Sequence, residues 1–159
     1  NQVHLLVGLT CNSINGQKEA NVPQLFTYRL FISHSWNYGD AYEKLVSMLN
    51  SAPFFQYANY SVPKEDPVHN VRTDSELYEA IKSQIRPVNC VLILAGVYAT
   101  YSNWIDKEIK IAKQDFNKPV IAIEPRASEK TSTIVKSNAN TIVKWNTQSI
   151  VDAIRQYSL

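Results

Sequence analysis

The 159-residue sequence is long enough to bury the core of one domain and too short for two domains of ordinary size. Its 16 basic and 14 acidic residues give a net charge of +2 without a long basic run, which argues against nucleic-acid binding. No apolar stretch reaches the length of a membrane span, and Cys11 and Cys90 do not form a disulfide framework. We therefore expect a cytoplasmic protein whose partners include neither a membrane nor a nucleic acid.

The N-terminal 24 residues differ from the rest of the chain. An apolar segment, Val3–Leu9, is followed by a polar stretch that contains Gly16 and Pro23. Such a composition is typical of a connecting segment. We interpret residues 1–24 as an N-terminal arm or linker and residues 25–159 as one compact domain.

The first half of this domain begins with a strand at 25–32, a nearly continuous apolar run. Asp40 and Glu43 have capping-box spacing, which predicts that a helix begins there. A shorter, aromatic-rich strand is predicted at 53–60. The loop that follows is long enough to be functional.

The second half alternates helices with strands. Thr73 and Glu76 form a second capping box, and the helix that they begin ends at Pro87. Strands are predicted at 89–96, 119–123 and 141–145. The helices that follow these strands are predicted to begin with a cap at Ser102, near Thr131 and after a cap at Asn146.

Five strands that alternate with helices predict a parallel sheet with right-handed crossovers. For a chain of this length we expect a flavodoxin-like three-layer α/β sandwich with strand order 2-1-3-4-5. In that order a crevice opens where strands 1 and 3 end side by side. We therefore expect Ser33 and Gly96 to lie next to each other at this edge.

Glu108 is the most unusual charged residue of the helix that follows the third strand. The buried stripe of this helix consists of Ile105, Ile109, Ala112 and Phe116. Glu108 falls roughly 70° from the centre of that stripe, and no basic residue lies three or four positions away from it. A buried, unpaired carboxyl group has a raised pKa, as functional groups often do. The alternative is a structural role, in which Glu108 bonds a distant arginine, such as Arg29 or Arg72, or a backbone N–H.

Other residues at the predicted crevice suit a nucleotide better than a metal ion. The sequence has no Gly-rich phosphate loop and no Cys/His set with zinc spacing. A phosphate would then have to bind at a helix N-terminus near Ser33, Ser35 or Ser102. His34 could act as a base, although a lone histidine is more often only packed. Five aromatic residues could stack on a base or fill the crevice walls: Trp36, Tyr38, Tyr98, Tyr101 and Trp104.

Two segments resemble the boxes of Toll/interleukin-1 receptor (TIR) domains. The first TIR box is similar to Phe31–Trp36, and the S-x-W-x-x-x-E box is similar to Ser102–Glu108. The chain resembles more closely the bacterial and archaeal TIR-like branch that includes the Thoeris anti-phage defence protein ThsB. Segments that recur in this branch are Asn59–Pro63, Lys118–Ile121 and Val143–Asn146. The resemblance covers residues 28–156.

This resemblance implies a TIR-type flavodoxin-like fold. Many bacterial members cleave the nicotinamide–ribose bond of NAD and release a cyclic or conjugated ADP-ribose signal, and Glu108 occupies the position of their catalytic glutamate. NAD would be the substrate, with no separate cofactor and no metal. The residues expected to bind it are Ser33, His34, Ser35, Trp36, Tyr98, Ser102 and Trp104.

Some TIR domains are not enzymes, so the fold alone does not decide the activity. The alternative hypothesis is a non-enzymatic module that assembles through TIR–TIR contacts. In such a module Glu108 would be a structural hydrogen-bond acceptor.

Overall fold

The structure, a computed structural model, describes residues 25–33, 39–61, 73–95, 102–124 and 133–159. The proposed N-terminal arm and most of the predicted 61–72 loop lie outside these residues. So do four of the predicted binding residues: His34, Ser35, Trp36 and Tyr98.

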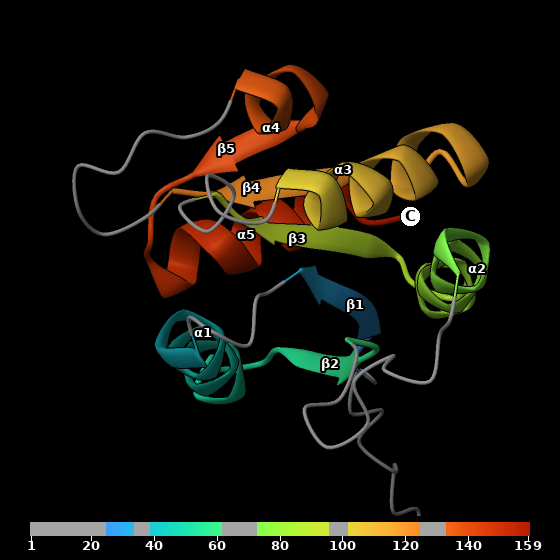
Figure 1. Cartoon of the computed structure of the whole chain (residues 1–159). Coiled ribbons are helices and arrows are strands. Elements are labelled where there is room, and N and C mark those ends of the chain that lie inside the picture. Colours follow the sequence, from blue (N-terminus) through green and yellow to red (C-terminus); the bar gives the residue numbers. More distant parts are fainter. Residues whose placement is uncertain (1–24, 34–38, 62–72, 96–101, 125–132) are drawn as a thin grey trace, which may run out of the picture.

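The five strands form one parallel sheet with the order β2-β1-β3-β4-β5 (Figure 1), as predicted. The strands are β1 (Thr27–Ser33), β2 (Gln56–Asn59), β3 (Cys90–Leu94), β4 (Val120–Ile123) and β5 (Thr141–Val143). The flavodoxin-like fold class is thereby confirmed.

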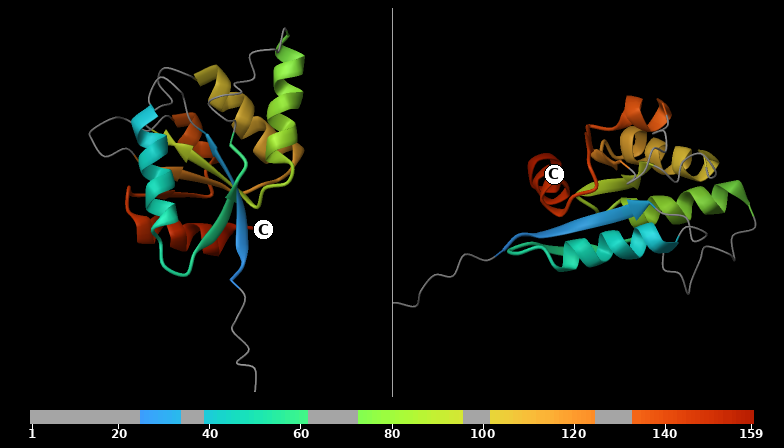
Figure 2. Two further views of the ribbon diagram at one scale, coloured as in Figure 1. Left: turned by 90° about the horizontal axis from the view of Figure 1, so that it is seen from below. Right: turned by 90° about the vertical axis from the view of Figure 1, so that its left-hand side faces the viewer.

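Helices cover both faces of the sheet, which gives the predicted three layers (Figure 2). One face packs against α1 (Gly39–Asn50) and α5 (Thr147–Tyr157). The other face packs against α2 (Asp74–Ile85), α3 (Ser102–Lys110) and α4 (Thr133–Asn138). Helix α3 continues directly as a π-helical segment, η3 (Ile111–Asp115).

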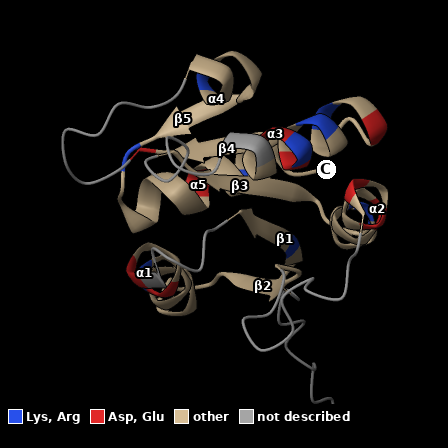
Figure 3. Cartoon of the chain, viewed as in Figure 1, with Lys and Arg blue, Asp and Glu red and all other residues tan. Residues whose placement is uncertain are grey.

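The core is divided by the sheet because successive side chains of a strand point to opposite faces. In β1, Leu30 and Ile32 belong to the core beneath α1 and α5, whereas Phe31 belongs to the core beneath α2, α3 and α4. The same alternation places Ser33 on the side of Phe31. Every residue of β3 is buried, as a central parallel strand requires. The charged side chains lie mainly on the helices (Figure 3).

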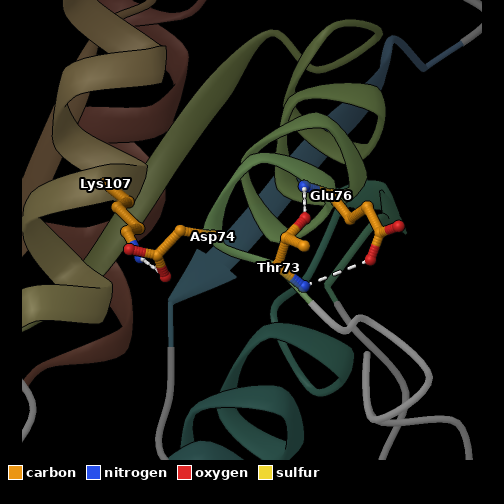
Figure 4. Close-up of polar contacts among 4 residues, drawn as sticks. All are labelled: Thr73, Asp74, Glu76 and Lys107. Carbon is orange, nitrogen blue, oxygen red and sulfur yellow. Dashed lines mark hydrogen bonds and ion pairs between the residues drawn. The ribbon is translucent and has the colours of Figure 1, made fainter.

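The helix ends confirm two of the four predicted caps, and the side chain of a third, Ser102, lies outside the described residues. The Thr73 hydroxyl accepts from Glu76 N–H, and the Glu76 carboxylate accepts from Thr73 N–H, both at 3.2 Å (Figure 4). Asn146 caps α5 through the backbone N–H of Ser149. The capping box predicted at Asp40 is wrong, because α1 already begins at Gly39. None of the described helices is long and apolar enough to cross a membrane.

Candidate functional site

Glu108 is buried on α3, with 2% of its surface exposed. The stripe that positions it is buried as predicted, since Ile105, Ile109 and Ala112 are almost fully covered. Helix α3 contacts α2 and α4 in addition to the sheet. The covered part of its surface is therefore wider than the stripe and includes Glu108.

Ser33, the last residue of β1, faces the same layer of helices. It pairs in register with Ile93 of β3, and Ile93 lies in the core beneath α3. The expected neighbour of Ser33, Gly96, lies outside the described residues, and the described partner of Ser33 in β3 is Ile93. Ser33 is 2% exposed and lies close enough to Glu108 to affect the pKa of its carboxyl group.

Trp104 holds one oxygen of this carboxyl group. Its indole N–H donates a hydrogen bond of 2.7 Å from Nε1 to Glu108 Oε1. Residues four positions apart lie on the same side of a helix, so the two side chains can meet. The ring is partly buried against the core. Trp104 therefore fixes the Glu108 carboxyl group by a hydrogen bond, and its ring is itself packed against the core.

The second carboxyl oxygen, Glu108 Oε2, and the hydroxyl of Ser33 are both buried without a hydrogen-bond partner among the described residues. The hydroxyl lies near the carboxyl group and favours its charged form, but the pair does not have the geometry of a hydrogen bond. Two buried polar atoms that lack partners are costly in a folded protein and need an explanation. A ligand hydroxyl group that reaches both atoms would supply the missing bonds.

Burial raises the pKa of Glu108 from 4.5 to about 7, and the polar contacts with Ser33 and Trp104 oppose this rise only in part. Within the described part of the chain no lysine or arginine forms an ion pair with Glu108. The adjacent Lys107 reaches away to Asp74, at 2.8 Å (Figure 4). The predicted burial and raised pKa of Glu108 are thus confirmed.

The bond from Trp104 is one that a structural acceptor would also make, but no described arginine bonds Glu108. Arg29 donates its side-chain N–H to the carbonyl of Pro87 and not to Glu108. Arg72, the other arginine considered, lies outside the described residues, as does Gly96. Ser102 begins α3 as predicted, but its side chain is not described.

Ser61 is a buried polar residue near the site that the sequence did not single out. It is 9% exposed, and its hydroxyl accepts a hydrogen bond of 2.9 Å from the backbone N–H of Ile32, the residue before Ser33. The Asn59 side chain accepts from Ser61 N–H at 3.0 Å, a turn that asparagine favours. This Asn-x-Ser spacing was the available signal, but it does not show where the hydroxyl points.

The described residues offer no cluster of three or more His, Cys, Asp or Glu side chains that could hold a metal ion. The chemistry available at the site is that of a carboxyl group with a pKa near neutrality, fixed by an indole and close to a hydroxyl group. Such a group can accept hydrogen bonds from hydroxyls or stabilise a developing positive charge.

No curated protein sequence matches the chain. A solved structure similar to this one is that of Clostridium botulinum CMP N-glycosidase, BcmB, with a TM-score of 0.43 and 10% identity over 80% of this chain and 98% of that chain. A likeness this distant says nothing about the substrate of the present chain.

The family described as "Thoeris protein ThsB, TIR-like domain" matches residues 31–130, more than half of the chain. The matched segment begins in β1, two residues before Ser33, and contains all of α3, including Trp104 and Glu108. The predicted resemblance is thereby confirmed. This chain belongs to the family of Thoeris ThsB TIR-like domains.

Proposed function

We propose that this protein is an enzyme that cleaves the bond between nicotinamide and ribose in NAD or a related nucleotide. The product would be a cyclic or conjugated ADP-ribose signal that acts in anti-phage defence. Membership of the ThsB TIR-like family supports this proposal. The observation that carries it is the buried carboxyl group of Glu108, with one oxygen bonded to Trp104 and the other without a partner among the described residues.

In the proposed reaction the bond between C1′ of the ribose and the nicotinamide nitrogen breaks. Both electrons of that bond go to the nitrogen, so nicotinamide leaves as a neutral molecule and needs no proton from an acid. Positive charge then develops on the ribose, and the Glu108 carboxylate stabilises it or holds the ribose hydroxyl groups. Water or a hydroxyl group then attacks C1′ and loses its proton.

Trp104 and Ser33 have supporting roles in this proposal. The indole N–H fixes one carboxyl oxygen and leaves the other available to the ribose. The Ser33 hydroxyl, also without a partner among these residues, would bond the same sugar from the β1 side. NAD is the proposed substrate, and the chemistry needs no further cofactor.

The test is to incubate the purified protein with NAD and identify nicotinamide and the second product by mass spectrometry. Glu108→Gln keeps an acceptor for the Trp104 N–H but removes the charge, so we expect a loss of turnover of roughly 1000-fold. Glu124→Gln is the matched control, because Glu124 directly follows β4 at the same end of the sheet. We expect this control to turn over NAD like the wild type.

Equal turnover by the Glu108→Gln variant and the control would overturn the proposal. If the wild type releases no nicotinamide and Glu108→Gln only lowers the melting temperature, the assembly module becomes the better description. In that case Glu108 would serve stability, and self-association, measured by light scattering, would be the activity to follow.

A further inference from the structure

The end of β2 deviates from the regular ladder that joins it to β1. Tyr60 N–H still donates to the carbonyl of Leu30, at 2.8 Å. In a regular parallel pair, the N–H of Ile32 would next donate to the carbonyl of Tyr60. It donates instead to the side-chain hydroxyl of Ser61, at 2.9 Å and away from solvent. A side chain has thus taken the place of the ladder carbonyl.

The backbone of Ser61 is itself held by a second set of hydrogen bonds, which leads to helix α1. Its backbone N–H donates to the Asn59 side chain at 3.0 Å, and the Asn59 amide donates to the Tyr42 hydroxyl at 2.8 Å. Tyr42 belongs to α1, on the far face of the sheet from Glu108. A chain of hydrogen bonds therefore runs from α1 through Asn59 and Ser61 to the Ile32 amide of β1.

The Ile32 N–H belongs to the peptide that joins Phe31 to Ile32, directly before Ser33. Because Ser33 follows Ile32 and is the last residue of β1, the direction of its side chain depends on how firmly the backbone at Ile32 is held. We propose that Ser61 is a positioning residue, whose hydrogen bond with the Ile32 amide fixes the end of β1 and keeps the Ser33 hydroxyl next to the Glu108 carboxyl group. The part of this inference that concerns turnover rests on the proposed function. The part that concerns the position of Ser33 and the ionisation of Glu108 does not.

The test measures the ionisation of Glu108 and needs no enzymatic activity. In protein labelled with 13C-glutamate, the Glu108 carboxyl resonance is the one that is absent from Glu108→Gln, and its titration midpoint is followed by NMR. The Ser33 hydroxyl favours the charged form of Glu108, so its misplacement raises the pKa. We expect an upward shift of the midpoint in Ser61→Ala and in Ser33→Ala. The double variant should shift no further than Ser33→Ala, since Ser61 acts through Ser33.

Three further variants separate positioning from a general loss of stability. Ser61→Thr keeps the hydroxyl group and should restore the wild-type midpoint. Asn59→Ala removes the exposed support of Ser61 and should shift the midpoint in the same direction, even if Ser61→Ala fails to fold. Ser51→Ala removes a hydroxyl that bonds the Met48 carbonyl at the end of α1, and it should leave the midpoint unchanged.

The inference is overturned if Ser33→Ala raises the midpoint while Ser61→Ala and Asn59→Ala do not. It is also overturned if the shifts of Ser61→Ala and Ser33→Ala add in the double variant. In an active preparation, Ser61→Ala should lose roughly tenfold in kcat, and Ser61→Thr should recover it. If the wild type shows no turnover but the midpoints shift as expected, the positioning role stands and only the proposed reaction fails.

Discussion

The Glu108 carboxyl group combines two properties that are seldom found together in a folded protein. It is almost fully buried, yet one of its oxygens has no hydrogen-bond partner among the described residues. Burial disfavours the charged form, and no nearby cation compensates for it within the described chain. The group therefore titrates close to neutral pH, which has consequences for both stability and catalysis.

The first consequence is a pH-dependent stability. Between pH 4.5 and about 7 the folded protein keeps a proton on Glu108 that the unfolded chain releases, so the free energy of unfolding falls as the pH rises and levels off above about 7. At about 1.4 kcal/mol per pH unit, the full effect is about 3 kcal/mol. Glu108→Gln lacks this titration. Its stability relative to wild type, measured by urea unfolding, should rise by about that amount from pH 4 to pH 8.

The control for this measurement is Ser51→Ala, which removes no titratable group, so its stability relative to wild type should not vary over the same pH range. A constant difference between Glu108→Gln and the wild type would mean that the Glu108 pKa is close to that of an exposed glutamate.

The second consequence concerns the pH dependence of the proposed reaction. The carboxylate is the active form, so kcat/KM for NAD should rise with pH and level off above about 7, the pKa in the free protein. The nicotinamide ring of bound NAD is positively charged and favours the carboxylate. The inflection in kcat should therefore lie at lower pH than that in kcat/KM. Steady-state kinetics between pH 5 and pH 9 would check this, and a kcat/KM that falls as the pH rises through 7 would contradict it.

At the scale of single elements, α3 and η3 show how one helix can serve both the core and the site. At about 100° per residue, Ile111 would lie roughly 120° from Ile105, well off the predicted stripe. The structure nevertheless buries Ile111 completely, in the π-helical segment that follows α3. Extra residues inserted into a helix as a π turn are often found at functional sites. Ile111 and Glu108 lie on the same side of the predicted stripe. The buried surface of α3 and η3 is therefore wider on that side.

Helix α2 gives an element-scale prediction that is independent of the site. Thr73→Ala removes the hydroxyl that accepts from Glu76 N–H and breaks the reciprocal capping box. We expect the free energy of unfolding, measured by urea titration, to fall by about 1 kcal/mol. Ser75→Ala, an exposed change in the same turn, should alter it by less than about 0.5 kcal/mol. Equal effects of the two changes would mean that the cap contributes nothing to stability.

At the scale of the whole molecule, stability is concentrated in the centre of the sheet. Strand β3 lies between β1 and β4, and all three are covered by helices on both faces. Strand β5 lies at one edge and has no fully buried residue. The order of the strands therefore also sets which positions tolerate substitution.

A pair of isoleucines tests this distribution. Ile121 in β4 is fully buried, and Ile121→Ala should cost about 2–5 kcal/mol because it leaves a cavity. Ile142 in β5 is 37% exposed, and Ile142→Ala should cost less than about 1 kcal/mol. Urea unfolding of both variants would check the contrast. Similar losses of unfolding free energy in the two variants would show that the edge strand contributes as much to stability as the centre of the sheet.

Much of the architecture could be predicted because it depends on local signals. Continuous apolar runs predicted the strands, and helical spacing between them predicted parallel connections and the strand order. Two of the four predicted caps, at Thr73 and Asn146, followed from residue type and spacing. The cap at Asp40 failed because the spacing of Asp40 and Glu43 is equally compatible with positions inside the first turn of a helix that begins one residue earlier.

The site was predicted only in part. The sequence by itself placed Glu108 at the edge of a buried stripe with no cation within one helical turn, and this determined that its pKa would be raised. The tertiary structure decided that Ser33 reaches Glu108, that Ser61 holds the end of β1, and that Trp104 donates to one carboxyl oxygen. Helical and strand periodicity specify which face a residue occupies. The distance between two faces depends on strand register and on the rotation of a helix against its neighbours, and these are set by packing between residues far apart in the chain.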